Sequence, residues 1–362
     1  MPWYLPLACV GGAALLSALV TAWVRRRAPR WGFVDRPGGH KSHAREVALG
    51  GGIAIVSGVV LPMLAVLIAA RLALHFSGLA LPEFVRTHLD GIVAKSAEGT
   101  ALIAGAIILH ILGLIDDLRP LPAALRLMTE IAVAAALAVG FDLRILSHLG
   151  PAASTAVTVV WIVTITNAFN FLDNMDGLAA GVGVIVAAVY SVIAAITGQV
   201  FVPACCWLLA GALLGFLPFN FHPASIYLGD AGSTVVGFLI AVFTVLTTFY
   251  NPAHDDRPIG VIAPLLVLAV PLYDTISVLY LRWSAGRPIW TGDRAHWSHR
   301  LVRAGMSARR AVLFIWIATF ATALPALLLP QASWPLAVGI LVHTLAVVSL
   351  VALLESAHGS RP

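Results

Sequence analysis

The sequence has few charged residues for its length. Of its 362 residues, only 11% are Asp, Glu, Lys or Arg, whereas 60% are hydrophobic. A soluble protein of this size needs a more highly charged surface, so the composition excludes that class. No charged side chain occurs in four long stretches, residues 3–24, 47–70, 231–250 and 311–354. Because about 20 apolar residues in a helix span the hydrocarbon core of a bilayer, these stretches predict a polytopic, all-α membrane protein.

Cysteine is also scarce. Cys9, Cys205 and Cys206 lie inside apolar stretches and have neither metal-ligand nor disulfide-framework spacing, so we interpret them as packing residues. The formal net charge is +5. This charge does not indicate a nucleic-acid partner, because the basic residues flank the apolar stretches instead of covering a solvated face.

Eleven transmembrane helices are expected in a single domain, residues 1–362. Ten is the alternative, because the long charge-free stretches 177–221 and 311–354 are each divided into two spans. The first span follows no positive charge and precedes three arginines, so we expect it to be retained with the N-terminus outside. The expected spans are residues 3–24, 47–70, 99–115, 120–141, 152–172, 177–197, 200–219, 231–250, 259–281, 311–330 and 334–354.

The distribution of basic residues predicts the orientation of these spans. Of the 22 Lys and Arg residues, 16 lie in loops that follow odd-numbered spans and five lie in loops on the other side. Cytoplasmic loops of membrane proteins carry the excess of Lys and Arg. We therefore expect the loops after odd-numbered spans to be cytoplasmic.

Polar residues gather in the same loops. Five segments rich in Asp, Asn, His and Gly follow odd-numbered spans, and the opposite loops contain no comparable segment. These segments are DRPGGHKSHA (35–44), LIDDLRP (114–120), NAFNFLDNMDG (167–177), NFHPASIYLGDAGS (220–233) and GDRAHWSHR (292–300). Their common side predicts an active site on the cytoplasmic face.

Two groups of carboxylates are candidates for chemistry. Asp116 and Asp117 end an apolar stretch, where a carboxylate pair is costly to desolvate unless it meets a cation; a solvated helix end is the alternative. Asp173 and Asp176 share one helical face with Asn170. Such oxygen ligands suit Mg²⁺, which keeps several waters and is completed by substrate phosphates.

A glycine-rich segment precedes the span at 231–250. It contains Gly229, Asp230, Gly232 and Ser233. Small residues at the start of a helix let an anion such as a phosphate approach the backbone N–H groups. The alternative for Asp230 is a helix N-cap.

Imidazole and guanidinium groups occur together in the last of the five polar segments. His296 and His299 are spaced i and i+3, beside Arg294 and Arg300. The alternative interpretation is a basic segment next to the membrane, which satisfies the charge rule without binding a ligand. The same two interpretations apply to Lys41 and His43.

Asp274 lies within the ninth expected span. A carboxylate in a membrane span indicates a functional site, and the alternative here is a partner for backbone groups freed by the nearby Pro271. Intramembrane carboxylates also line ion pathways, so an ion-coupled transporter is the competing class. Most acidic residues of this chain lie at span ends rather than at the midplane, which favours an enzyme.

In order and spacing, three of these segments resemble the polyprenyl-phosphate N-acetylhexosamine-1-phosphate transferase family, also called glycosyl transferase family 4. They are the Asp116–Asp117 pair, NAFNFLDNMDGLAAG (167–181) and FNFHPASIYLGDAGS (219–233), and the resemblance runs from about residue 35 to residue 306. It implies a phosphotransferase of the cell inner membrane that transfers an N-acetylhexosamine 1-phosphate from a UDP-sugar to undecaprenyl phosphate, releasing UMP. The implied cofactor is Mg²⁺, with Mn²⁺ as the alternative ion.

The resemblance also implies roles for individual residues. Asp230 and Asn170 correspond to Mg²⁺ ligands, Asp116 and Asp117 would hold the lipid phosphate, and Asp173 and Asp176 would contact the nucleotide. The expected catalytic set is Asp116, Asp117, Asp173, Asp176, His296 and His299. With the loop arguments above, the expected substrate-binding set is Lys41, His43, Asn220, Gly229, Gly232, Ser233, Arg294 and Arg300.

The sequence departs from the family pattern at a few positions. Ser298 replaces one histidine of the usual HxHH motif, Asn174 stands where glycine is common, and Ala48 replaces a proline. We expect Ser298 to be peripheral, because it projects away from His296. The chain lacks the consecutive histidines of the phospho-N-acetylmuramoyl-pentapeptide transferases, which favours the N-acetylglucosamine branch and the start of envelope polysaccharide synthesis. A muramoyl-pentapeptide substrate, a modified UDP-amino sugar and a homodimer remain open.

Overall fold

The computed structural model describes residues 3–35, 46–76, 83–247, 258–288 and 295–359, and these residues are mostly helical. The helices that follow the expected spans are α1 (Tyr4–Trp31), α2 (Gly51–His75), α5 (Ser96–Leu118), α6 (Ala123–Gly140), α7 (Pro151–Leu172), α8 (Leu178–Ile196), α9 (Phe201–Asn220), α10 (Asp230–Leu246), α12 (Ala269–Ser284), α14 (Ala308–Ala323) and α15 (Trp334–Gly359). Shorter helices are α3 (Glu83–Thr87), α4 (Leu89–Ala94), α11 (Ala263–Val267), α13 (Trp297–Arg303) and the 3₁₀ turns η1 (Ser147–Leu149), η2 (Pro258–Ile262) and η3 (Leu324–Gln331). Two short strands, β1 (Val34–Asp35) and β2 (Val47–Ala48), pair antiparallel.

The predicted all-α polytopic class is confirmed. Within the described residues, nine helices are long and apolar enough to cross a bilayer. The helix pair Gly260–Val267 and Ala269–Ser284 is bent by 62° at its junction, and the number reaches ten when this pair is counted as one span. The expected span at 231–250 forms α10, which has only 17 residues. At 1.5 Å per residue it is about 25 Å long, shorter than a bilayer core.

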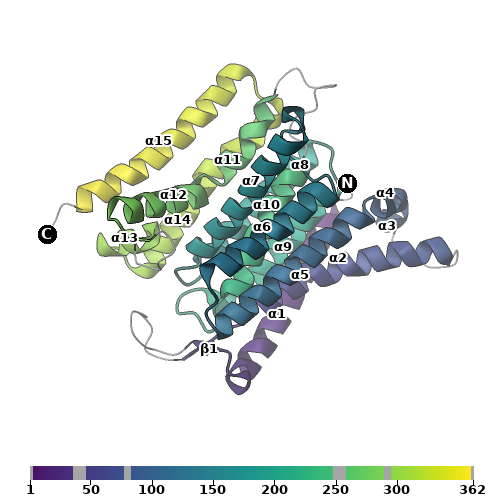
Figure 1. Ribbon diagram of the computed structural model, residues 1–362, viewed down its shortest axis with the longest axis horizontal. Helices are drawn as coiled ribbons and strands as arrows, with labels where there is room; N and C mark the ends of the chain where they lie inside the picture. Colours follow the sequence, from purple (N-terminus) through teal and green to yellow (C-terminus); the bar gives the residue numbers. More distant parts are fainter. Residues whose placement is uncertain (1–2, 36–45, 77–82, 248–257, 289–294, 360–362) are drawn as a thin grey trace.

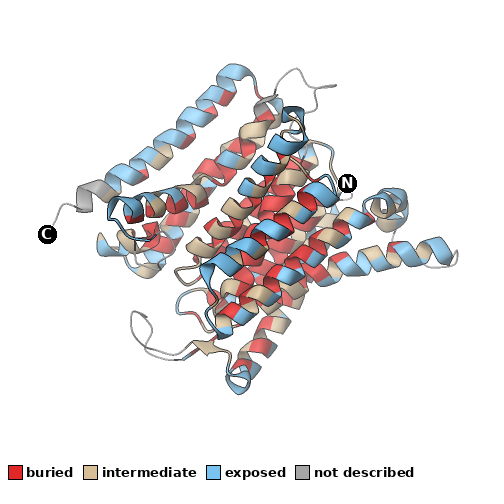
Figure 2. Ribbon diagram, viewed as in Figure 1, coloured by how far each residue is buried: buried red, intermediate tan, exposed pale blue. Residues whose placement is uncertain are grey.

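Helix α10 lies at the centre of the bundle (Figures 1 and 2). Every residue from Ala231 to Thr244 is buried, and α10 packs mainly against α5 and α7. The outer faces of the peripheral helices α1 and α15 are apolar and exposed, with Leu19 and Leu345 as examples. Protein rather than lipid therefore surrounds α10, so its length is not set by the thickness of the bilayer.

The packing role predicted for the cysteines is confirmed. Cys205 and Cys206 are buried in α9, and Cys9 is partly buried in α1, which packs directly against α9. All three are free thiols.

One end of the bundle collects the polar loops. The C-terminal ends of α5, α7 and α12 reach this end, and α10 begins there, whereas α3 and α4 lie at the opposite end (Figure 1). The start of α2 is hydrogen-bonded to the segment that leads into α10. The N–H groups of Gly51 and Gly52 donate to the carbonyl oxygens of Tyr227 and Leu228, at 3.0 and 3.1 Å. This pairing fixes the approach of the chain to α10.

Candidate active site

The start of α10 lies directly beside the end of α5. Gly113 of α5 allows this approach, because a Cβ atom at that position would lie 2.4 Å from Cα of Ala231. One turn earlier, Nδ1 of His110 donates to the carbonyl oxygen of Ala231 at 3.0 Å. The two helices therefore meet with Asp117 at the first turn of α10.

Asp117 binds the start of α10 through both of its carboxylate oxygens. One oxygen accepts from the N–H of Asp230 at 2.7 Å, and the other accepts from the N–H of Ala231 at 3.3 Å. Gly229 has a φ of +72° and leaves room for this carboxylate, since a Cβ atom there would lie 2.5 Å from an Asp117 oxygen. The anion at the positive end of this helix is thus a side chain of the protein itself.

This arrangement corrects the predicted phosphate site at the glycine-rich segment. The N–H groups that were expected to face a ligand are bonded to Asp117. Gly232 is packed instead, because a Cβ atom on it would lie 2.4 Å from the Leu228 side chain and 3.0 Å from Cα of Gly52. The N-cap alternative for Asp230 is also wrong, since Gly229 occupies the N-cap position of α10.

Arg126, in the first turn of α6, joins two of the predicted carboxylates. Its Nη1 donates to Oδ2 of Asp116 at 2.5 Å and to Oδ2 of Asp230 at 2.9 Å. The second oxygen of Asp116 accepts from the N–H of Leu121 at 2.5 Å. A buried carboxylate with a guanidinium and a backbone donor is well compensated. Carboxylates of α5 and α10 are therefore connected through a residue of α6.

Asn170, near the end of α7, contacts the same aspartate. Its Nδ2 donates to Oδ1 of Asp230 at 2.7 Å and to Oγ of Ser233 at 3.1 Å. The buried hydroxyl of Ser233 donates in turn to the carbonyl oxygen of Gly229 at 3.0 Å. The two residues predicted as Mg²⁺ ligands are therefore in direct contact, and Ser233 lies beside them.

Asp173 follows α7 and completes the carboxylate cluster. It lies close to Gly229, Asp230 and Asp117 at the start of α10. Burial and the negative charge of these two aspartates raise the pKa of Asp173 well above its usual value. A cation bound beside these carboxylates would favour the ionised form of Asp173.

Asp176 and Asn220 hold loops at the edge of the cluster. Asp176 accepts from Nδ1 of His222 at 2.8 Å. The buried amide of Asn220 accepts from the N–H of Gly177 and donates to the carbonyl oxygen of Ile226, both at 3.0 Å. In the structure these two side chains connect the loop after α7 to the loop before α10.

The cluster is rich in carboxylates and poor in cations. Mg²⁺ commonly binds one or two protein carboxylates and completes its shell with water and phosphate oxygens. No group of three or more His, Cys, Asp or Glu side chains arranged to hold a metal occurs in the described part of the chain. Asp230 and Asn170, with the amide turned to present its oxygen, fit the sparser pattern of Mg²⁺. The surplus negative charge of Asp117 and Asp173 fits it as well.

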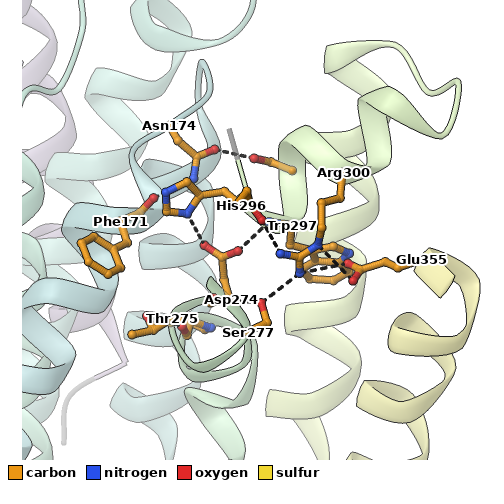
Figure 3. A network of polar contacts seen from close by, with 12 residues as sticks. Phe171, Asn174, Asp274, Thr275, Ser277, His296, Trp297, Arg300 and Glu355 are labelled. Atoms are coloured by element: carbon orange, nitrogen blue, oxygen red, sulfur yellow. Dashed lines mark hydrogen bonds and ion pairs between the residues drawn. The ribbon is translucent and has the colours of Figure 1, made fainter. Parts of the chain in front are cut away.

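A second polar cluster adjoins the first at the start of α13 (Figure 3). The buried imidazole of His296 meets the ring of Phe171 edge to face, with 5.8 Å between ring centroids. The Ser298 hydroxyl donates to Oδ1 of Asn174. Phe171 and Asn174 belong to the same turn of chain as Asn170, so the two clusters are contiguous. His299 is half-buried in α13.

One prediction for this second cluster needs correction. Ser298 is not peripheral, because it is buried and its hydroxyl is bonded to the loop after α7. Substrate binding by Arg300 stays a prediction, and in the structure its three nitrogens are bonded to protein groups. Nε donates to Glu355 at 3.1 Å, Nη2 donates to Ser277 at 2.9 Å, and Nη1 donates to the carbonyl oxygen of Ala295. Arg300 therefore connects α13 to α12 and α15.

Some predicted residues cannot be placed, and one residue of the site was missed. Lys41, His43 and Arg294 lie outside the described residues. Arg126 has no predicted role beyond its contribution to orientation. Its signal in the sequence is the short connection between the expected spans 99–115 and 120–141, which brings the start of the second helix close to Asp116.

Comparison with known proteins bears directly on this cluster. The sequence model of glycosyl transferase family 4 matches residues 100–248, which include Asp116, Asp117, Asp173 and Asp230. A probable undecaprenyl-phosphate N-acetylglucosaminyl 1-phosphate transferase of Bacillus subtilis is 32% identical over 330 residues, which cover 88% of this chain and 84% of the relative. A decaprenyl-phosphate N-acetylglucosaminephosphotransferase of Mycolicibacterium smegmatis is 35% identical over 86% of this chain and 79% of the relative. The undecaprenyl-phosphate alpha-N-acetylglucosaminyl 1-phosphate transferase of Escherichia coli K12 is 26% identical over 84% and 78%.

Proposed function

The chain belongs to glycosyl transferase family 4, as its motifs predict, and on this basis we propose that it transfers N-acetylglucosamine 1-phosphate from UDP-N-acetylglucosamine to undecaprenyl phosphate. The names of its relatives describe phosphotransfer of this sugar to a polyprenyl phosphate. The observation that carries the proposal is the contact of Asp116, Arg126 and Asp230 at one end of a membrane-spanning bundle. A lipid-borne phosphate can reach such a position from the bilayer while a soluble nucleotide reaches it from water.

The reaction requires two anions to meet. An oxygen of the lipid phosphate attacks the phosphorus that carries the sugar. The new P–O bond forms as the bond from that phosphorus to the UMP oxygen breaks, and the bonding electron pair leaves with UMP. Catalysis is then a matter of positioning and of neutralising charge. Arg126, held by the buried Asp116, supplies a fixed positive charge for this purpose.

Mg²⁺, with Mn²⁺ as the alternative, would neutralise the diphosphate when bound. Asp230 and Asn170 would hold the ion. Asp117, which binds the first turn of α10, fixes the position of Asp230. His296 lies in the adjoining cluster, where an imidazole with an unprotonated nitrogen is suited to accept the proton of the attacking lipid phosphate.

Lipid-product analysis tests the sugar and the acceptor together. The purified protein in nanodiscs with undecaprenyl phosphate would receive radiolabelled UDP-N-acetylglucosamine, UDP-N-acetylgalactosamine or UDP-N-acetylmuramoyl-pentapeptide. We expect a diphosphate-linked lipid and an equal amount of UMP from the first donor. Preference for the pentapeptide donor would contradict the proposed substrate, and no lipid product from any donor would contradict the proposed reaction.

Asp230→Asn tests the proposed ion. The variant retains an oxygen for the Asn170 contact but loses the negative charge that a hard cation requires. We expect Mg²⁺ to raise the Tm of the wild type, because a ligand that binds only the folded state stabilises it, and to leave the Tm of Asp230→Asn unchanged. Asp142→Asn is the matched control, since Asp142 is an exposed aspartate paired with Arg144. An equal Mg²⁺ effect in wild type and Asp230→Asn would remove Asp230 from the ion site.

The cellular setting is part of the same proposal. The loops that contain the site carry most of the Lys and Arg residues, which supports an orientation with the site in the cytoplasm and the chain in the inner membrane. UDP-sugars are made in the cytoplasm, so the donor is available on that side. The product would be the first lipid-linked intermediate of an envelope polysaccharide.

A further inference from the structure

Asp274 of α12 has a buried carboxylate bonded to two successive residues at the start of α13. Its Oδ2 contacts Nδ1 of His296 at 3.0 Å, and its Oδ1 accepts from the N–H of Trp297 at 2.6 Å. The residue is 1% exposed and His296 is 6% exposed. Figure 3 shows the carboxylate between the imidazole and the first turn of α13. Both oxygens of Asp274 are therefore committed to this one segment.

The contact determines which imidazole nitrogen carries the proton. A carboxylate only accepts, so Nδ1 of His296 must donate to it. Nε2 makes no hydrogen bond to another described residue and is the nitrogen left for a ligand. The ring of Phe171 packs against the imidazole and limits its rotation. A histidine held in this way presents one defined nitrogen in one defined direction.

Other contacts also hold the start of α13 in place. Trp297 is 1% exposed and meets the rings of Tyr273 and Phe314, at 5.7 and 6.1 Å between centroids. Arg300 contributes a further bond to α12 through Ser277. Because these contacts already anchor α13, the charge of Asp274 is not needed merely to attach the helix.

We propose that Asp274 is a positioning residue for the transfer reaction, which acts by holding the imidazole of His296 with Nδ1 protonated and with the unprotonated Nε2 directed at the substrate as a proton acceptor. The inference rests on the proposed function of the site, since it requires that His296 meets the substrate. Asp274 itself touches no substrate. A purely structural role, as a cap for the N–H of Trp297, is the competing explanation.

Asp274→Asn separates the two explanations. The amide oxygen can still accept from the N–H of Trp297, so the cap is kept. The amide nitrogen must then donate to Nδ1 of His296, which forces the proton of the neutral ring onto Nε2. We expect kcat to fall by roughly 10- to 1000-fold, the scale of losing a positioned base, with little change in KM or Tm. Ser277→Ala is the matched control, because it removes a bond of α12 to Arg300 without touching His296.

A double-mutant cycle gives the decisive readout. If Asp274 acts through His296, Asp274→Asn has no further effect on kcat once His296→Ala is present, whereas the small effect of Ser277→Ala is the same in both backgrounds. The proposal would be overturned if Asp274→Asn lowered kcat by the same factor in the wild type and in His296→Ala. It would also be overturned if Asp274→Asn alone kept the wild-type kcat. Wild-type kcat for His296→Ala would overturn it together with the role proposed for His296. Failure of the wild type to make lipid product would instead refute the proposed function.

A second variant keeps the test available if Asp274→Asn does not fold. Asp274→Glu retains a carboxylate acceptor for Nδ1, and Asp274→Ala retains none. If Asp274 positions His296, kcat per folded protein should be about tenfold higher for Asp274→Glu than for Asp274→Ala. Equal kcat values for the two variants would overturn the proposal.

Discussion

Single side chains set the charge of the site, and Arg126 is the clearest case. It lies between a buried carboxylate and an accessible one, since the side chain of Asp116 is 6% exposed and that of Asp230 is 35% exposed. Asp116 therefore serves to hold the guanidinium, whereas Asp230 is the partner that a ligand can reach. A phosphate or cation arriving at Asp230 can replace one bond of Arg126 and leave the buried bond intact.

Arg126→Gln should lower kcat/KM by roughly 100- to 1000-fold, the cost of losing a positioned charge where negative charge develops. Arg126→Lys should recover part of this loss, because it restores the charge but not the planar fork of donors. Steady-state kinetics of lipid-product formation measure both effects. Arg144→Gln is the control, since Arg144 pairs with the exposed Asp142. Unchanged kcat/KM in Arg126→Gln would exclude Arg126 from the site.

Ser298 and Asn174 show why part of the site could not be predicted. Each residue departs from the family pattern, and the sequence shows each departure separately but not the contact between them. They are separated by 124 positions, so no local spacing connects them, and only the fold brings them into a hydrogen bond. With Ser298 1% exposed, an imidazole at this position exceeds the space available. The residues at the two positions are therefore expected to be energetically coupled.

Ser298→Ala should lower the free energy of unfolding by about 0.5–1.5 kcal/mol, because the Asn174 amide oxygen loses its donor. Ser298→His should cost more, through overpacking. Adding Asn174→Gly to Ser298→His should recover part of the Tm, since it removes the side chain that the imidazole meets. Thermal unfolding of the wild type, Ser298→His, Asn174→Gly and the double variant in detergent measures this coupling, and strictly additive losses would show that the two positions are independent.

Among the helices, the first turn of α10 determines the geometry of the site. It is bonded to Asp117 of α5, and its aspartate faces α6 and α7. The sequence predicts where these helices end, because charge-free stretches and turn residues mark the ends. It does not predict which ends touch, because the spans are apolar on most faces and periodicity alone does not choose a neighbour. The close approach at Gly113 depends on that choice.

Gly113→Ala should separate α5 from α10, because the new Cβ atom would lie 2.4 Å from Cα of Ala231, a backbone atom that cannot turn aside. We expect loss of most activity and a lower Tm, since Asp117 can no longer bind the first turn of α10. Gly99→Ala, on the same helix, is the control. Its Cβ atom would lie 3.5 Å from a Leu67 methyl group, an ordinary contact, so activity should be retained. Full activity of Gly113→Ala would show that the close approach is not required.

Over the whole molecule, the sequence predicts class and sidedness better than it predicts contacts. Polar segments at the ends of odd-numbered spans do meet, as the neighbours Asp116, Asp230 and Asn170 show. Their common side follows from alternation of spans, which any chain crossing a bilayer must obey. Partners such as Asp274 and His296 lie in different loops or spans and depend on packing that composition does not specify. The direction of the bundle relative to the cytoplasm rests on the Lys and Arg count alone and stays a prediction.

Cysteine labelling tests that direction. In a background without Cys9, Cys205 and Cys206, single cysteines at Arg119 and Ser307 lie at the end with the site, and one at Ser147 lies at the other end; all three positions are exposed. An impermeant thiol reagent should label the Ser147 position in intact cells and the other two only after permeabilisation. The reverse pattern would place the site outside the cytoplasm and contradict the proposed use of a cytoplasmic UDP-sugar.

Glu355 of α15 is bonded to Arg300 of α13 and to Tyr273 of α12, across 55 and 82 positions of the chain. Because a ribosome delivers helices to the membrane in order, α13 receives this partner only after α15 has entered the bilayer. A chain interrupted after α14 contains all the carboxylates of the site, yet its Arg300 lacks the counter-ion that fixes the histidine segment. Contacts of the histidine segment are therefore completed last during biogenesis, and a partly made chain is not expected to carry out the proposed reaction.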